Sequence, residues 1–402
     1  MNNYDFAIVG GGILGIATAY QLQKKYPEKL IVVFEKDDLL ADHQTGNNSG
    51  VIHSGLYYKP GSKKAELCMK GKHDLVEFAK KYNVPHDICG KVVVATEERE
   101  IPILEKIFAN GQANGCEGIE LINGDEIKEK EPFLVGVKGI WVPTTGIIDY
   151  RRMTEVMAEQ LLLINPKSKI LTKHEVQNVE TKDGKSIITA NQTKFSSEFV
   201  VFCGGLHADR LAKKDDIKLD LKIVPFRGDY YDLTEKGMHK VKNLIYPVPD
   251  PEFPFLGVHF TRMVVGGVEC GPNAVFSFKR EGYKRSDFNL RDSLDALSYV
   301  GLWKLFSKHW KKGLLEYKRA YSKKLFLQTL QKMIPSLTME DIKPARAGVR
   351  AQALDADGGL VYDFKIEEKG NHFHVLNAPS PAATACLSIG EYICNTVSEK
   401  IS

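Results

Sequence analysis

The first 35 residues constrain the fold of this chain more than any other segment. Residues 5–10 have the composition of a short buried strand and run into Gly10-Gly11-Gly12-Ile13-Leu14-Gly15, which fits the pattern G-x-G-x-x-G. A helical stretch follows over 13–25, and a second apolar strand, 30–34, ends at Glu35. A strand, a glycine turn, a helix and a second strand with a terminal acid together predict a dinucleotide-binding βαβ unit.

The residue types in this unit match what a bound dinucleotide requires. The first glycine permits the tight turn, the second lets the backbone approach a pyrophosphate, and the third lets helix and strand pack closely. The helix start offers free N–H groups and a positive dipole end. The acid after the second strand accepts hydrogen bonds from an unphosphorylated ribose, which favours FAD or NAD over NADP. The expected contacts are Gly10, Gly12, Ile13, Leu14, Gly15, Glu35 and Lys36.

Composition excludes several other classes. A net charge of +4 over 402 residues is too small to argue for nucleic-acid binding. The seven cysteines are scattered, odd in number and without C-x-x-C, which favours a reducing compartment and predicts no metal site. No apolar run approaches the roughly 20 residues that span a bilayer. Because the first strand begins within about five residues of Met1, no signal peptide is expected and the predicted location is cytoplasmic.

The segments after Glu35 favour FAD over NAD. Residues 43–55 form a loop of glycines and hydroxyl and amide side chains, which suits a second contact with a large cofactor. The apolar strand 198–205 ends in two glycines and is expected to return to the cofactor. The predicted fold is α/β (α+β overall), a Rossmann-like FAD-binding domain interleaved with a mainly antiparallel substrate-binding domain. The FAD-binding domain is predicted at 1–85, 145–215 and 340–402, and the substrate-binding domain at 86–144 and 216–339, with a basic helical region at 291–334.

Hydrophobic patterns predict the remaining elements. The expected strands are 91–96, 139–143, 372–377 and a pair, 169–180 with 186–190, around the turn Asp183-Gly184. The expected helices are 99–114, 151–163, most of 291–333, and a closing helix that starts at Pro379-Ser380-Pro381 and ends near Lys400.

Residues 6–15 and 43–58 resemble the D-amino-acid-oxidase-like FAD oxidoreductases. Further segments, at 225–230, 244–251, 254–259, 271–274, 347–352 and 377–384, resemble the subgroup of that family that oxidises L-2-hydroxyglutarate to 2-oxoglutarate. The resemblance covers essentially the whole chain. It implies a D-amino-acid-oxidase/glutathione-reductase-like fold, FAD and a small hydroxy-dicarboxylate substrate. Because no residue is marked as a covalent attachment site, the FAD is expected to be noncovalent.

Oxidising a secondary alcohol next to a carboxylate requires a base for the hydroxyl proton. His53 is the first choice, since imidazole titrates near neutrality and the residue follows the cofactor loop directly. The related glycerol-3-phosphate dehydrogenases carry a similar Ile-His-x-Gly-Leu segment at their substrate site. The alternative is a histidine that only hydrogen-bonds FAD or the loop. His259 is the competing base, or else a core histidine.

Cations must hold the substrate carboxylates, and a planar guanidinium does so with two parallel hydrogen bonds. Arg350 is the first candidate, because small residues around it let the chain approach the flavin. Arg227 and Arg262 are the others, with ordinary ion pairs as the alternative. The remaining candidates for contact with substrate are Tyr57 and Tyr58, which alternatively only pack, Ser380, and Lys63 and Lys64, which alternatively belong to a solvated face.

The remaining cofactor contacts are assigned to five further segments, with Thr45, Asn48, Ser49 and Val51 at the flavin end. The last helix could place its positive end near the edge of reduced flavin where negative charge collects, with a plain helix cap as the alternative. The predicted contacts are Thr45, Asn48, Ser49, Gly50, Val51, Val176, Gly204, Gly205, Gly348, Arg350, Pro381, Ala382 and Ala383.

Residues 302–324 are unusually basic and also contain Trp303 and Trp310. Amphipathic helices of this composition suit anionic membrane surfaces, so the region could dock on an inner membrane face and give a quinone access to reduced flavin. The alternatives are a helix whose tryptophans are in the core, and a protein-partner surface.

Other functions remain open at this stage. The substrate could be glycerol 3-phosphate, an amino acid or an amine, and a non-catalytic FAD-binding protein is the rival from another class. The electron acceptor, quinone or oxygen, and the oligomeric state are not determined by the sequence.

Overall fold

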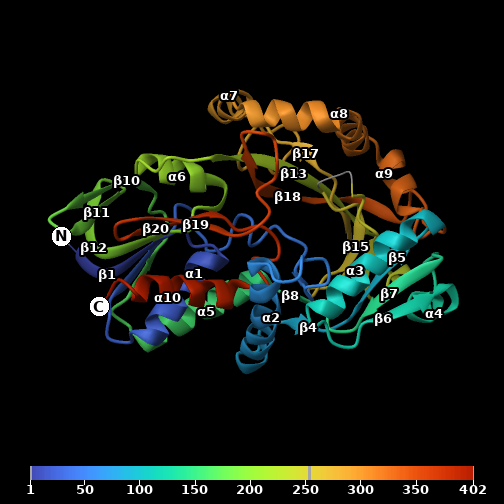
Figure 1. The fold of residues 1–402 in the computed structure, drawn as a ribbon, viewed down its shortest axis with the longest axis horizontal. Helices are drawn as coiled ribbons and strands as arrows, with labels where there is room; N and C mark the ends of the chain where they lie inside the picture. Colours follow the sequence, from blue (N-terminus) through green and yellow to red (C-terminus); the bar gives the residue numbers. More distant parts are fainter. Residues whose placement is uncertain (1, 252–254, 402) are drawn as a thin grey trace.

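The computed structural model describes residues 2–251 and 255–401, so Pro254 of the segments named above lies outside the described residues. The chain forms two lobes side by side along its longest axis, an eight-stranded sheet in one and a nine-stranded sheet in the other (Figure 1). Both termini lie at the far end of the first lobe (Figure 1).

The first lobe is built on a mostly parallel sheet from segments far apart in the chain. Its strands run in the order β10 (Val176–Lys182), β11 (Lys185–Ala190), β12 (Thr193–Phe202), β1 (Asn2–Val9), β2 (Ile31–Phe34) and β9 (Lys169–Leu171). Beside β12 lies β20 (His372–Asn377), which also pairs with β19 (Lys365–Lys369). Strands β9, β2, β1, β12 and β20 are mutually parallel, as expected for strands joined through helices and other long crossovers.

Four helices cover one face of this sheet: α1 (Ile13–Lys25), α2 (Lys63–Lys81), α5 (Tyr150–Ile164) and α10 (Cys386–Ser398). They bury a core that includes Ile8, Ile16 and Phe373. The predicted α1 agrees with the structure, but α2 was not predicted. It begins after Ser62, whose side chain accepts a hydrogen bond from the Ala65 N–H and so caps the first turn.

The second lobe is built on a mainly antiparallel sheet. Its order is β17 (Val275–Phe276), β13 (Leu221–Leu233), β16 (Val268–Gly271), β15 (His259–Arg262), β14 (Leu244–Pro247), β5 (Lys91–Ala95), β7 (Lys138–Val142) and β6 (Glu120–Asn123). The long strand β18 (Ile342–Asp355) pairs with β13. By sheet membership β18 therefore belongs with this lobe, although the predicted domain limit at residue 340 places it with the FAD-binding domain.

A separate three-stranded sheet contains β3 (Val51–Ile52), β8 (Gly146–Ile148) and β4 (His86–Asp87), in that order. The remaining helices are α3 (Ile101–Ala113), α4 (Gly124–Lys130), α6 (Ala208–Lys214), α7 (Leu290–Leu297), α8 (Val300–Tyr321) and α9 (Lys323–Leu330), with short 3₁₀ turns at 98–100, 205–207 and 238–240. Within the described residues no helix combines the length and the apolar character needed to span a membrane.

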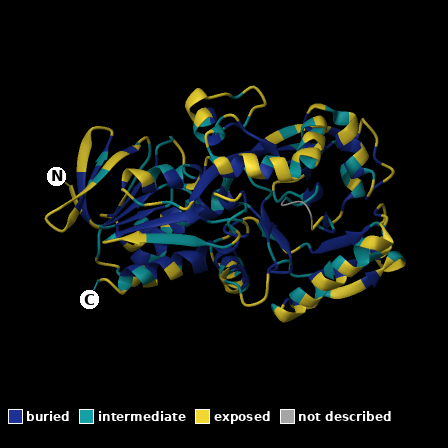
Figure 2. Ribbon diagram, turned by 45° about the horizontal axis from the view of Figure 1, so that its top comes forward, coloured by how far each residue is buried: buried dark blue, intermediate teal, exposed yellow. Residues whose placement is uncertain are grey.

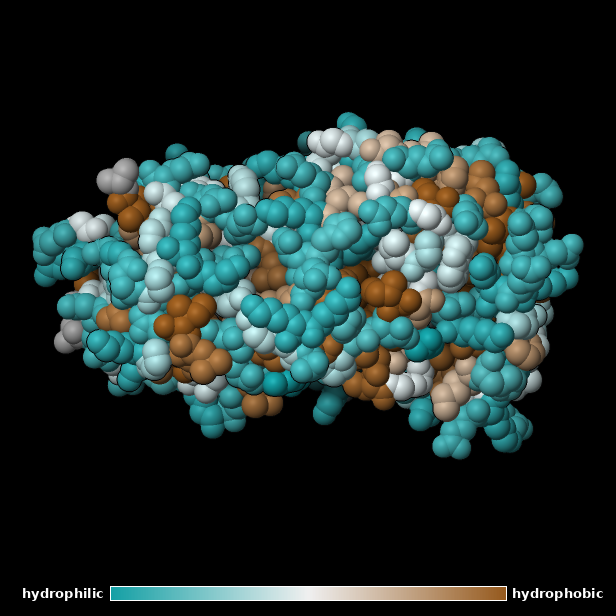
Figure 3. Space-filling view, turned by 90° about the horizontal axis from the view of Figure 1, so that it is seen from below, coloured by the Kyte–Doolittle hydropathy of each residue, from teal (hydrophilic) through white to brown (hydrophobic). Residues whose placement is uncertain are grey.

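Burial follows these layers. The strands of both sheets are largely buried, while exposed residues gather on the outer faces of helices and in turns (Figure 2). The face seen from below in Figure 3 is mostly hydrophilic, with smaller hydrophobic groups between hydrophilic ones.

Two predicted elements differ from the structure. The expected strand 169–180 is two strands, because β9 pairs with β2 whereas β10 turns into a hairpin with β11. The closing helix begins at Cys386 rather than at Pro379–Pro381. Two prolines remove backbone donors there and restrict the residues before them, so 379–385 forms hydrogen-bonded turns instead.

Candidate active site

A cavity of about 1250 Å³ lies between the lobes. Its walls come from the glycine turn after β1, the 41–53 loop, the ends of β12 and β20, and strands β14, β15 and β18. Pockets for drug-sized ligands span roughly 300–1,000 Å³, so this cavity has room for a large cofactor together with a small substrate.

The three motif glycines have different environments, which fit a bound dinucleotide. A Cβ atom at Gly15 would collide with the Gly10 carbonyl oxygen, and one at Gly10 with the Cys203 carbonyl oxygen, so both positions require glycine for packing. A Cβ atom at Gly12 would meet only Thr45 Oγ1, at 3.4 Å, so no packing contact explains this glycine. The space in front of Gly12 opens on the cavity, where a pyrophosphate would lie.

Backbone donors around this turn are arranged for an acceptor group. Gly12 is the N-cap residue of α1 and provides no side-chain cap, so the helix start faces the cavity with free N–H groups. The Ile13 N–H donates to Thr45 Oγ1 at 3.1 Å. Glu35 lines the cavity, and its carboxylate accepts hydrogen bonds from the N–H groups of Gly11 (2.7 Å) and Asp37 (3.0 Å). These bonds fix the acid where it could receive ribose hydroxyls.

The cofactor loop is fixed by a residue that the sequence did not suggest. Arg346, on β18, donates from Nη1 to the Gly46 carbonyl and from Nη2 to the Asn48 carbonyl, both at 2.7 Å. Its Nε donates to Glu269 of β16 at 2.8 Å. The arginine therefore joins the loop of the first lobe to the sheet of the second. The sequence does not distinguish Arg346 from the other arginines of the chain, so it gave no sign of this role.

His53 lies at the end of β3 with both its backbone and its ring held in place. Its N–H donates to Thr384 Oγ1 at 3.1 Å, and its Nε2 lies 3.2 Å from Ser380 Oγ. Burial, with the nearby charges of Lys91 and Lys64 and its neighbour His259, lowers the pKa of His53 to about 3. The ring is therefore neutral at pH 7 and can accept a proton.

His259 faces the same cavity from β15. Its Nδ1–H donates to the Gly257 carbonyl at 2.9 Å, which leaves Nε2 as the unprotonated nitrogen. The ring stacks on Tyr246 with centroids 4.1 Å apart. Burial lowers the pKa of His259 to about 4, and Arg350 acts in the same direction. Both candidate bases are thus present, and both are neutral.

Arg350 reaches the cavity from β18, and its only described hydrogen bond is from Nη1 to the Asn273 carbonyl at 3.1 Å. A Cβ atom at Gly228 would lie 3.2 Å from Nη1, so that glycine makes room for the guanidinium. No ion pair joins Arg350 to a carboxylate of the described residues, although Glu316 acts on it from a greater distance, and burial lowers its pKa. A half-buried guanidinium without an ion-pair partner fits an anionic substrate.

Two other predicted arginines do not line the cavity. Arg227 is buried against Asp229, with Nε 3.0 Å from Oδ1, and donates to the Lys284 carbonyl. Arg262 pairs with Asp87 at 2.6 Å. Both arginines therefore form ordinary ion pairs, which the sequence left open as the alternative to substrate binding. The cations that line the cavity are other residues.

The two tyrosines lie behind the cavity wall. Tyr58 is buried and its hydroxyl hydrogen-bonds Ser380, which links it to His53 through that serine. The hydroxyl of Tyr57 is buried without a hydrogen-bond partner among the described residues, and its ring faces Lys91 at 4.8 Å. Gly50 is likewise absent from the cavity wall; its carbonyl accepts from the Ile148 N–H.

The other predicted cofactor residues line the cavity together: Gly10, Gly12, Ile13, Leu14, Gly15, Glu35, Lys36, Thr45, Asn48, Ser49, Val51, Val176, Gly204, Gly205, Gly348, Ser380, Pro381, Ala382 and Ala383. They come from seven separate segments, so the fold brings together residues that are far apart in the sequence. The specific role of each remains a prediction.

Two buried lysines near His53 add positive charge to the site: Lys64, which the sequence offered as a candidate, and Lys91, which it did not. Lys64 lines the cavity from α2, and burial lowers its pKa to about 8. Lys91, on β5, lies behind the wall, with Nζ over the rings of Tyr57 (4.8 Å) and Tyr246 (5.1 Å). Burial lowers the pKa of Lys91 to about 8 as well. The sequence offered one sign that Lys91 is buried: this lysine belongs to a strand whose other residues are apolar.

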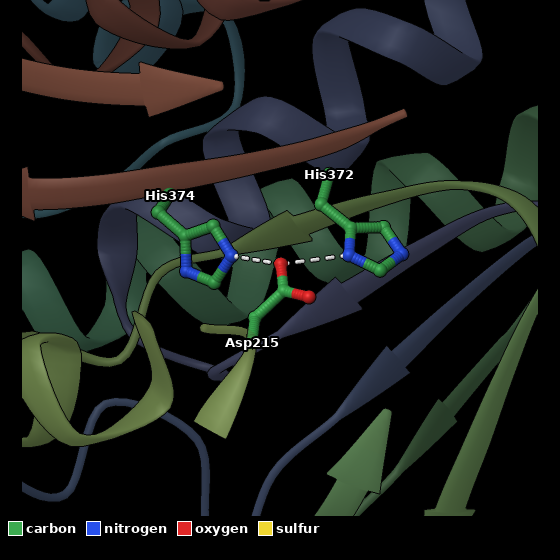
Figure 4. A group of neighbouring side chains, drawn as sticks. All are labelled: Asp215, His372 and His374. Atoms are coloured by element: carbon green, nitrogen blue, oxygen red, sulfur yellow. Dashed lines mark hydrogen bonds and ion pairs between the residues drawn. The ribbon is translucent and has the colours of Figure 1, made fainter. Parts of the chain in front are cut away.

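Outside the cavity, Asp215, His372 and His374 form a buried cluster in the first lobe (Figure 4). Asp215 Oδ2 accepts from His372 Nδ1 and His374 Nε2, each at 2.8 Å. His372 Nε2 also lies 2.8 Å from Ser186 Oγ. The spacing would suit a metal ion, but His372 Nδ1 and His374 Nε2 already hydrogen-bond Asp215, so the cluster links α6 to β20, and His374 Nδ1 has no hydrogen-bond partner among the described residues.

Comparisons with known proteins agree with this architecture. The family model described as FAD dependent oxidoreductase matches residues 5–396. L-2-hydroxyglutarate dehydrogenase of Indibacter alkaliphilus is 48% identical over 393 residues, covering 98% of each chain. The mitochondrial L-2-hydroxyglutarate dehydrogenase of Homo sapiens is 43% identical over 416 residues, covering 99% of this chain and 89% of that protein.

Solved structures show the same fold. L-alpha-glycerophosphate oxidase from Mycoplasma pneumoniae with FAD bound superposes with a TM-score of 0.81 at 23% identity, over 99% of this chain and 95% of that one. Glycine oxidase from Geobacillus kaustophilus gives a TM-score of 0.73 at 16% identity, over 99% and 95%. At these identities the likeness concerns the fold alone. The family match spans nearly the whole chain, and the chain therefore belongs to the FAD dependent oxidoreductases.

Proposed function

We propose that this protein is an L-2-hydroxyglutarate dehydrogenase, which oxidises L-2-hydroxyglutarate to 2-oxoglutarate. The observation that carries the proposal is that two neutral histidines and an unpaired arginine line the same cavity as the dinucleotide turn. The full-length relatives that bear this name support the choice of substrate.

In the proposed reaction the substrate hydroxyl gives its proton to His53 Nε2 as the carbon–oxygen double bond forms. FAD, when bound, supplies the acceptor for the hydride that leaves carbon 2. Arg350 binds a substrate carboxylate with parallel N–H donors and so fixes the orientation of carbon 2. Ser380 and Thr384 hold the His53 ring and backbone, which keeps the base in place.

The test is anaerobic reduction of the purified yellow holoenzyme, followed by the visible absorption of its flavin. L-2-hydroxyglutarate is expected to bleach the band rapidly, whereas D-2-hydroxyglutarate, glycerol 3-phosphate and glycine should not. Bleaching by glycerol 3-phosphate or glycine instead would identify that compound, and not L-2-hydroxyglutarate, as the substrate. A flavin-loaded protein that none of the four reduces would support the non-catalytic alternative.

We also propose that α8 docks on an anionic membrane surface, where a quinone could take the electrons. Trp303 and Trp310 are 55% and 59% exposed, so neither is in the core. Leu314 and Leu315 are also exposed, and the helix carries Lys304, Lys308, Lys311 and Lys312. Exposed indoles beside lysines are the composition of helices that lie in the membrane interface.

Sedimentation with vesicles tests the docking surface. The protein should bind vesicles that contain phosphatidylglycerol more tightly than vesicles of phosphatidylcholine alone, and the double variant W303A/W310A should bind less. Leu163→Ala removes an apolar side chain that is even more exposed, from α5 in the other lobe, and serves as the control. Equal binding by both variants would exclude α8 as the docking element.

A further inference from the structure

Lys64 has an unusual position for a lysine in the first turn of a helix. It is 6% exposed, whereas its neighbour Lys63 is exposed. Its Nζ donates to the Tyr362 carbonyl at 3.3 Å and lies over the rings of Tyr362 (4.1 Å) and Tyr58 (5.3 Å). No ion pair joins this ammonium group to a carboxylate of the described residues, although the charge of Asp363 acts on it from a greater distance. A buried ammonium carries three donors and is costly to leave without an anion.

Within the cavity, Lys64 is associated with His53 and Arg350 with His259. The Tyr58 ring, 5.3 Å from Lys64 Nζ, is linked through Ser380 to His53. The charge of Lys64 acts on His53, and that of Arg350 acts on His259. Both cations and both histidines line the same cavity.

Tyr362 indicates which end of the cavity Lys64 occupies. This side chain is 55% exposed although it lines the cavity, so Lys64 lies close to the opening toward solvent. Arg350 contacts another part of the wall, the Asn273 carbonyl and the Phe255 ring, whose centroid is 5.6 Å from the guanidinium carbon. The carbon that reacts must lie inside, beside the histidines and the dinucleotide cradle. The group near Lys64 is then the part of the substrate that does not react.

We infer that Lys64 recognises the distal carboxylate of a 2-hydroxy-dicarboxylate, while Arg350 binds the carboxylate next to the reacting carbon. The inference rests on the proposed function and adds to it a residue that selects dicarboxylates over monocarboxylates. Lys91 is behind the wall and reinforces the positive potential without touching the substrate.

The experiment compares L-2-hydroxyglutarate with L-2-hydroxypentanoate, which has the same five-carbon skeleton but a methyl group in place of the distal carboxylate. Lys64→Met should lower the second-order rate constant of anaerobic flavin reduction by L-2-hydroxyglutarate about 10- to 100-fold, the effect of removing a hydrogen bond to a charged group. With L-2-hydroxypentanoate the same variant should stay within about threefold of the wild type. Lys64→Arg, which keeps the charge, should recover part of the loss.

Lys63→Met is the matched control, because Lys63 makes the corresponding contacts with a tyrosine outside the cavity, donating to the Tyr392 hydroxyl at 3.0 Å. This variant should retain wild-type rates with both substrates. Binding gives an independent readout: Lys64→Met should weaken the affinity for 2-oxoglutarate, measured from the perturbed flavin spectrum, and leave that for 2-oxopentanoate unchanged.

The outcomes separate the two proposals. A wild-type holoenzyme that L-2-hydroxyglutarate fails to reduce would remove the proposed function and this inference with it. If the wild type is reduced, Lys64→Met alone decides the inference. Equal losses with both substrates, or no loss with either, in a variant with full flavin content would overturn the role of Lys64.

Discussion

His53 and His259 illustrate how burial changes a side chain that the sequence can only locate. Both histidines would titrate near pH 6.5 in an unfolded chain. Burial lowers the pKa of His53 to about 3 and that of His259 to about 4, so neither carries a proton at rest. The sequence ranked them by distance from the cofactor loop, but both face the same cavity.

We therefore expect His53→Gln to keep its FAD and to slow anaerobic flavin reduction by L-2-hydroxyglutarate by about 10²- to 10⁴-fold, the usual contribution of a general base. His259→Gln should slow it less, because the proposed reaction assigns the proton transfer to His53. Stopped-flow absorbance of both variants at equal flavin content checks this. Fast reduction in His53→Gln together with slow reduction in His259→Gln would assign the base to His259.

The βαβ turn shows, at the scale of an element, that glycines in one motif serve different ends. Gly15 and Gly10 are required by the contact between α1 and the strands, whereas the position of Gly12 is restricted only by Thr45 Oγ1 at 3.4 Å. The φ angle of Gly12, −75°, is one that alanine also adopts.

Gly12→Ala should therefore fold with a free energy of unfolding within about 0.5 kcal/mol of the wild-type apoprotein but bind FAD at least about tenfold more weakly, because the methyl group occupies the place of the pyrophosphate. Gly15→Ala should destabilise the protein itself, by about 1–3 kcal/mol. Urea unfolding of the apoproteins and fluorescence titration with FAD measure the two effects. Unchanged FAD affinity in Gly12→Ala would mean that the cofactor lies elsewhere.

The Asp215–His372–His374 cluster joins two elements of the first lobe, and its charge state sets its pH response (Figure 4). Burial lowers the pKa of His374, although the hydrogen bond to Asp215 opposes the shift. Burial alone would raise the pKa of Asp215, but the hydrogen bonds from His374 and His372 outweigh it and lower that pKa. The folded state therefore favours neutral His374 and ionised Asp215.

Because the pKa of folded His374 is below its unfolded value near 6.5, unfolding takes up a proton at mildly acidic pH, and stability falls as pH falls below about 6.5. The loss is at most about 1.4 kcal/mol per pH unit for this one residue, and it ends below the folded pKa. His53 and His259 add losses of the same sign. His374→Gln, which can still donate to Asp215 but does not titrate, should have a shallower decline in urea midpoint between pH 7 and 5. Equal slopes in variant and wild type would exclude this residue as a cause.

At the scale of the whole molecule, the cavity connects the lobes. Gly348 and Arg350 line it from the sheet of the second lobe, and Gly10 and Gly12 from that of the first. Arg346 also joins the lobes here, through its hydrogen bonds to the carbonyls of Gly46 and Asn48. A cofactor in the cavity would thus add contacts to both lobes at once.

Removal of FAD should therefore lower the stability of the folded protein, and free FAD at about a hundred times its Kd should restore about 2.7 kcal/mol. Differential scanning calorimetry of apoprotein titrated with FAD measures this as a concentration-dependent rise of Tm. Gly12→Ala should need correspondingly more FAD for the same rise. A Tm that does not respond to FAD in the wild type would contradict a cofactor site between the lobes.

The sequence alone determined the dinucleotide unit, because a strand, a glycine turn, a helix and an acid are local features whose spacing is fixed by backbone geometry. It also gave the family resemblance and the separate segments that contribute to the cavity. Local patterns fixed α1 over Ile13–Lys25, whereas the start of α10 was missed, because two prolines and turn hydrogen bonds override the helical pattern there.

Only the tertiary structure decided which cations face the cavity. Arg227 and Arg262 have the same chemistry as Arg350 in the sequence, but neighbouring carboxylates pair with the first two and leave the third unpaired. Lys63 and Lys64 are adjacent in the first turn of α2, but their side chains point in different directions. Lys63 is therefore exposed to solvent, whereas Lys64 lines the cavity. Such differences depend on which distant segments pack together, and a linear pattern does not contain that information.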